Sequence, residues 1–143
     1  MTIAYLDTSA VAKWYLNEQN SELFSAYVQQ LAVAAISSLT RTEFRSLLAR
    51  RRRLQQITPE NESIALATFE HDISVGHLEL HPVSDAVFME ASNLIGRFPE
   101  LPIRTLDALQ LSMAQTCGAI EFATADAGLA NAARILGFET VLF

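Results

Sequence analysis

The sequence predicts one α/β domain, a three-layer sandwich in which a central parallel sheet of about five strands is flanked by helices. First, short apolar runs alternate with longer segments of helical periodicity along the whole chain. Second, helical patterns separate the runs, so successive strands need crossover connections and lie parallel. Third, 143 residues that are 50% hydrophobic and 18% charged suit one core and exclude a disordered chain. Residues 1–143 are therefore assigned to one domain.

The first predicted strand is the apolar run at residues 3–6, which ends at the polar segment 7–9. Aspartate, threonine and serine favour helix N-termini because their side-chain oxygens accept hydrogen bonds from free amides, so a helix is expected over 10–16. After a polar break, helical spacing resumes over 21–31. Residues 33–36 form the second short apolar run and the second predicted strand.

Two further helices lead to the third strand. In the segment 40–53, apolar side chains share one helical face and arginines occupy the rest. Proline is well placed at a first helical position, so a helix begins at Pro59, and Gly76 ends it. The third predicted strand is 78–83, where Pro82 indicates an end or an edge position.

The same rules predict the remaining elements. A helix capped by Ser84 runs to the loop at 98–103, which contains two prolines, and the next helix carries Leu106, Leu109 and Met113 before Gly118 stops it. The last elements, in chain order, are a strand at 120–124, a helix at 126–136 and a strand at 140–143.

The number of cysteines and the hydropathy of the chain indicate the cellular compartment in which the protein is expected. Cys117 is the only cysteine, so no disulfide can form within the chain, which suits a reducing compartment. There is no signal-peptide pattern, and no apolar run approaches the ~20 residues of a membrane helix. We expect a cytoplasmic protein with no membrane partner.

The net charge is −6, but the basic residues are concentrated in one segment. Six of the ten fall between positions 41 and 53, where Glu43 is the single acid. Nine of the ten are arginines, whose planar guanidinium groups pair well with phosphate or carboxylate. The segment is either a solvated helix end or a surface that binds a polyanion.

Four carboxylates follow strands or begin helices at one edge of the predicted sheet: Asp7, Glu43, Asp107 and Asp126. Because ligands bind at the carboxyl ends of parallel strands, we expect these side chains to converge there. Each also has a simpler role. Asp7 and Asp126 suit helix caps, Asp107 suits a first helical turn, and Glu43 suits an exposed surface.

Electrostatics favours a bound cation if the four acids do converge. Two carboxylates ~5 Å apart repel by about 3 kcal/mol at an effective dielectric constant of ~20. Such a cluster must protonate, separate or bind a cation. Magnesium takes carboxylate, water and phosphate oxygens, and a bound divalent ion polarises a phosphoryl group and acidifies a water. The predicted chemistry is therefore metal-assisted reaction at phosphate.

Other chemistries have less support in the sequence. Zinc prefers cysteine and histidine, and the three histidines (His71, His77 and His81) lie away from the acids in the chain. Cys117 has no histidine partner in view, and neither GxxxxGK[ST] nor GxGxxG occurs. A phosphatase of the haloacid-dehalogenase type needs a second acid two residues after Asp7, where Ser9 stands, and a lysine later than Lys13.

Four blocks in order resemble the PIN-domain ribonucleases, and among them the VapC toxins of type II toxin–antitoxin pairs. The blocks are YLDTSA at 5–10, Glu43 in the helix after Ile36-Ser37, RTLDAL at 104–109 and TAD at 124–126. The resemblance covers essentially the whole chain. It implies a PIN-like fold and an endoribonuclease dependent on Mg²⁺ or Mn²⁺ that cuts tRNA or rRNA. It also implies a homodimer blocked by a small cognate antitoxin.

The resemblance also assigns roles to residues. It implies that Asp7, Glu43, Asp107 and Asp126 bind the metal and are catalytic. Hydroxyl groups are expected to orient these acids, namely those of Thr8, Ser9, Ser37 and Thr124. Arginines are expected to hold the RNA backbone beside the acids, namely Arg41, Arg45, Arg50 and Arg104.

Two points stay open at this stage. Some relatives have a further acid just past the fourth position, where this chain has Gly128 and Asn131, so the site holds either one metal ion or two. Arg104 either contacts RNA or pairs with a local acid. The alternative function is a non-catalytic PIN-like module that binds RNA or protein.

Overall fold

One five-stranded parallel sheet organises the computed structural model, which describes residues 2–143. The strands are β1 (Ile3–Leu6), β2 (Val33–Ser37), β3 (Glu79–His81), β4 (Glu121–Thr124) and β5 (Glu139–Leu142). The helices are α1 (Thr8–Tyr15), α2 (Ser21–Val28), α3 (Ser38–Arg53), α4 (Pro59–Val75), α5 (Asp85–Arg97), α6 (Thr105–Thr116) and α7 (Ala127–Ile135). Met1, the first residue of the predicted domain, lies outside the described residues.

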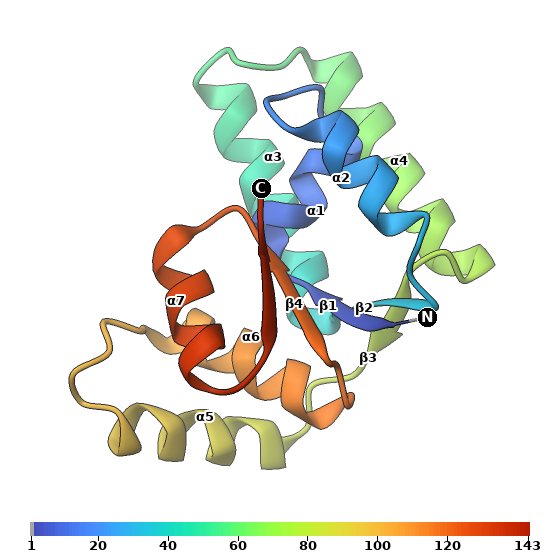
Figure 1. Cartoon of the computed structure of the whole chain (residues 1–143). Helices are drawn as coiled ribbons and strands as arrows, with labels where there is room; N and C mark the ends of the chain where they lie inside the picture. The colour runs from blue at the N-terminus through green and yellow to red at the C-terminus, as the bar shows by residue number, and fades with distance from the viewer. Residues whose placement is uncertain (1) are drawn as a thin grey trace.

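Helices cover both faces of the sheet and confirm the predicted three-layer architecture. Helices α1 to α4 lie over one face and α5 to α7 over the other (Figure 1). The central strand shows how the sequence produces this, because successive side chains of a strand point to opposite faces. Ala4 and Leu6 of β1 pack with α1 to α4, whereas Tyr5 packs with α5 to α7.

The strand order, β3-β2-β1-β4-β5, reverses direction at β1. From β1 the chain winds outward through β2 to β3, then returns through α5 and α6 to β4 on the other side of β1. The amide of Asp7 extends this pairing by donating to the carbonyl of Ala123 (3.1 Å). The carboxyl ends of β1 and β4 therefore flank a topological switch point, the place where open α/β sheets bind ligands.

The predicted elements are all present, with differences at their ends. Helix α1 begins at Thr8 rather than residue 10, because Asp7 already caps it. Strand β3 is shorter than the predicted 78–83: the Leu78 amide bonds to the Asp72 carbonyl instead of the sheet, and Pro82 has no amide to donate. None of the helices in residues 2–143 is long and apolar enough to cross a membrane.

Candidate active site

Asp7 lies at the centre of the sheet's carboxyl edge, between the end of β1 and the start of α1. It is 5% exposed. Its Oδ1 accepts hydrogen bonds from the Ala10 amide (3.0 Å) and the Ser9 hydroxyl (2.7 Å), and its Oδ2 accepts one from the Thr124 hydroxyl (3.0 Å). Helix capping and side-chain hydroxyls together therefore fix the orientation of this carboxylate.

Ser9 and Thr124 also tie β1 to β4. The Asp126 amide donates to Thr124 Oγ1 (3.0 Å), and the Ala125 amide donates to Ser9 Oγ (2.9 Å). Both hydroxyls thus accept a backbone hydrogen bond while they face the Asp7 carboxylate. The structure places these two predicted hydroxyl residues in contact with Asp7.

Glu43 projects from the second turn of α3 toward the residue that follows Asp7. Its Oε1 accepts a hydrogen bond from the Thr8 hydroxyl (3.0 Å) and another from the Gln110 amide Nε2. Gln110 Nε2 also lies 3.4 Å from Thr8 Oγ1. Glu43 is therefore held by α1 and α6 together, and neither of these two partners is a cation.

Gln110 is a site residue that the sequence analysis missed. It is 3% exposed, and its Oε1 accepts a hydrogen bond from the Tyr5 hydroxyl, so the side-chain amide is oriented with its nitrogen toward Glu43. Ser37, which was expected to orient an acid, instead hydrogen-bonds Tyr5 (2.9 Å). The available signal was a polar side chain one helical turn after Asp107, within the otherwise apolar segment of α6.

Burial governs the protonation of this part of the site. The pKa of Asp7 is raised from 3.8 to about 6. Desolvation is the main cause and the negative charge of Glu43 adds to it, while the hydrogen bonds from Ser9, Ala10 and Thr124 act in the opposite direction. Desolvation also raises the pKa of Tyr5 well above its ordinary value. The Tyr5 hydroxyl therefore stays protonated and remains a hydrogen-bond donor to Gln110.

Asp107 and Asp126 take the simpler roles as helix-terminal acids, yet each keeps one oxygen unused. Asp107 Oδ2 accepts from the Arg104 amide (3.1 Å) and Asp126 Oδ1 from the Leu129 amide (3.0 Å). Within residues 2–143, Asp107 Oδ1, Asp126 Oδ2 and Glu43 Oε2 have no hydrogen-bond or ion-pair partner. In the same range, no three His, Cys, Asp or Glu side chains are grouped so that they could share a metal ion.

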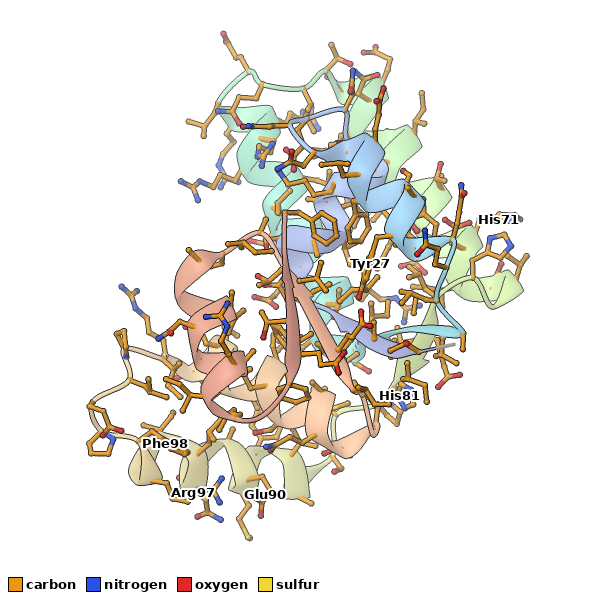
Figure 2. The ribbon with its side chains drawn as sticks, in the orientation of Figure 1. Tyr27, His71, His81, Glu90, Arg97 and Phe98 are labelled. Carbon is orange, nitrogen blue, oxygen red and sulfur yellow. The ribbon has the colours of Figure 1, made fainter. Side chains whose placement is uncertain are left out.

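The donor set suits a hard divalent cation. Every candidate ligand is a carboxylate oxygen, the type that Mg²⁺ and Mn²⁺ prefer. Burial is the main cause of the raised pKa of Asp7, and the charge of Glu43 adds to it, so a bound cation would favour the charged form of Asp7. Two histidines bond other acids, His77 to Asp72 and His81 to Glu79. Figure 2 labels His71 on α4 and His81 on β3, the strand at one side of the sheet.

The four predicted RNA-binding arginines occupy different environments. Arg41 forms a bidentate ion pair with Glu70 of α4, from Nε to Oε1 (2.9 Å) and from Nη2 to Oε2 (3.0 Å). Its charge is therefore balanced within the protein. Arg45 and Arg104 are exposed. Arg50 is also exposed, and it lines a cavity of about 670 Å³ that Thr8 and Glu43 line as well. Arg50 thus shares a cavity with Glu43, a predicted catalytic acid.

Comparisons with known proteins agree with this fold. A sequence model of the PIN domain matches residues 4–135. The structure is similar to VapC20 of Mycobacterium tuberculosis, with 17% identity, 90% of this chain and 94% of that chain covered, and a TM-score of 0.72. It is also similar to VapBC2 from Rickettsia felis bound to a promoter DNA fragment (17% identity, 99% and 98% covered, TM-score 0.69). VapBC-5 from Mycobacterium tuberculosis is similar too (21% identity, 100% of both chains, TM-score 0.64). No curated protein sequence matches the chain.

Proposed function

Because the chain belongs to the PIN-domain family, we propose that it is a metal-dependent endoribonuclease that hydrolyses phosphodiester bonds in RNA with Mg²⁺ or Mn²⁺. The observation that carries the proposal is the buried Asp7 carboxylate beside Glu43 at the switch point of the sheet, in a setting of oxygen ligands. In residues 2–143 no three of these acids are grouped as a ligand set, so a bound ion would have to draw Asp7, Glu43, Asp107 and Asp126 together. It would supply an acidified water and charge stabilisation at phosphate.

The chain's own residues would then perform the positioning. Ser9 and Thr124 each donate a hydrogen bond to one oxygen of Asp7, so the carboxylate would keep its orientation toward the bound ion. Thr8 and Gln110 hold one oxygen of Glu43 and leave the other unused. Partners of this kind around ligating carboxylates normally set ligand orientation.

We further propose that the protein is the toxin of a type II toxin–antitoxin pair, acting in the cytoplasm as a homodimer on tRNA or rRNA. The fold shared with VapC20, described as a toxin that cleaves the sarcin–ricin loop, supports the toxin role and an RNA target. The fold shared with the VapBC complexes supports a small antitoxin as partner.

Metal removal tests the proposed reaction. Purified protein incubated with total RNA and Mn²⁺ or Mg²⁺ is expected to cut at discrete positions, because the acids need a cation both to converge and to activate water. EDTA is expected to stop cleavage, and excess Mn²⁺ to restore it. Mapping of the cleaved ends by sequencing is the measurement. Cutting that persists in EDTA would contradict the proposal.

Gln110→Leu is expected to lower the cleavage rate about 10- to 100-fold while the protein stays folded, because Glu43 loses its amide donor but keeps Thr8. Gln115→Leu is the matched control: it makes the same change on an exposed position of the same helix. The measurement is the single-turnover cleavage rate, with circular dichroism as the check of folding. Equal rates in the two variants would show that Gln110 has no positioning role.

A further inference from the structure

The cavity that begins at Glu43 continues along one face of α3. Glu43, Leu47, Arg50 and Leu54 are spaced at i, i+4, i+7 and i+11, so they lie on one side of the helix and its C-terminal cap, and all four line the cavity. The rise per residue of an α-helix places Arg50 about 10 Å along the axis from Glu43. A ligand that touches both residues must therefore extend away from the carboxylates along the helix.

The charges in this cavity distinguish its two arginines. Arg51 Nη1 lies 2.8 Å from Glu18 Oε2, so the charge of Arg51 is balanced by an ion pair within the protein. Lys13 Nζ lies 3.5 Å from Oε1 of the same glutamate. Arg50 forms no ion pair within residues 2–143. Arg50 is thus the cation that the cavity offers to a ligand, and the complementary group is an anion.

The far part of the cavity combines aliphatic walls with one side-chain amide. Leu47 is half-buried and Leu54 is 55% exposed, so both present apolar surface to the cavity. Gln56 lines the same cavity and is exposed, so its side-chain amide is accessible to a ligand there. An amide offers one acceptor and two donors, a pattern that pairs with the edge of a nucleobase, while leucines suit the face of its ring. A volume of about 670 Å³ is within the range of small-molecule sites.

We propose that this cavity binds the nucleotide next to the phosphate at the Asp7–Glu43 pair, with Arg50 contacting its backbone phosphate and Gln56 reading its base. The inference rests on the proposed function, since it takes the reacting phosphate to lie at the acids. It adds a defined subsite and makes Gln56 a determinant of sequence preference.

Binding without metal tests the role of Arg50 independently of cleavage. The probe is a fluorescent single-stranded RNA 12-mer of randomised sequence, measured by anisotropy in EDTA over a series of salt concentrations. Arg50→Gln is expected to weaken binding several-fold and to reduce the slope of log K against log salt by about 0.7, the value for one phosphate contact on a single strand. Arg53→Gln removes the same charge from an exposed position of the same helix outside the cavity lining, and it is expected to change the slope less. Equal effects of the two variants would overturn the subsite.

Binding of the four homopolymeric 12-mers in EDTA tests the role of Gln56. Gln56→Glu replaces the amide donors with acceptors, so the affinity ratio between at least two homopolymers is expected to change about fivefold or more. Gln55→Glu adds the same charge one residue outside the cavity lining, and it is expected to leave the ratios unchanged. Unchanged ratios in Gln56→Glu would overturn base reading there. Wild-type protein that binds RNA through Arg50 and Gln56 but never cuts it would reject the nuclease and keep the subsite.

Discussion

Asp7→Asn is expected to lower the rate of metal-dependent RNA cleavage at least about a thousandfold while the fold is retained. The amide has one acceptor oxygen where the carboxylate has two, and it lacks the charge that attracts a divalent cation. Asparagine still caps a helix well, so α1 keeps its first turn. The measurement is the single-turnover cleavage rate in Mn²⁺, with cation binding by titration calorimetry as a readout that does not depend on activity.

Asp72→Asn is the matched control for this substitution. Asp72 is also a buried aspartate, but it accepts hydrogen bonds from Tyr15 (2.6 Å) and pairs with His77 (3.2 Å), and no site residue contacts it. We expect it to retain cleavage and cation binding. Full activity of Asp7→Asn in Mn²⁺ would contradict the assignment of Asp7 as a metal ligand.

The metal-free protein is expected to lose stability as the pH rises through the titration of Asp7. The pKa of Asp7 is about 6 in the folded chain against 3.8 as the ordinary value, so the folded state binds more protons between these limits. Stability therefore falls with rising pH in this window, by about 3 kcal/mol once both states are ionised. Binding of a divalent cation is expected to reverse this loss at neutral pH, since it stabilises the charged form.

Comparison with Asp7→Asn isolates this contribution from the other titrating groups. The free energy of unfolding, measured by urea titration in EDTA, is expected to rise in the variant relative to wild type by about 2 kcal/mol more at pH 7 than at pH 4. The sign follows from the direction of the shift, because asparagine removes a group whose charged form is unfavourable when buried. A difference that stays constant between pH 4 and pH 7 would show that Asp7 is not desolvated.

Local chemistry made most of the fold predictable. The run at 3–6 is bounded by residues that prefer helix caps, and Pro59 and Gly76 mark the ends of α4. Strand order was not predictable in this way, since it depends on where the α5–α6 crossover returns the chain. Leu106 is 48% exposed, although its spacing from Leu109 and Met113 predicts one shared buried face.

In the candidate site, too, residues at strand ends could be predicted from the sequence, whereas contacts between helices could not. Asp7, Ser9 and Thr124 follow strand ends, so a parallel sheet brings them together, as the structure shows. The bond from Gln110 to Glu43 joins residues 67 positions apart, and it depends on how α6 packs under Tyr5. The pairing of Arg41 with Glu70 similarly depends on the approach of α4 to α3. Contacts of this kind are properties of helix packing, which residue pattern alone does not encode.

Three helices begin at the edge where the carboxylates lie: Asp7 caps α1, Asp126 caps α7 and Asp107 lies in the first turn of α6. The aligned peptide dipoles of a helix place the equivalent of roughly half a positive charge at its N-terminus. These three backbone dipoles offset part of the repulsion that an anionic phosphate meets at an acidic edge. Because the contribution comes from the main chain, none of the side-chain substitutions described above removes it.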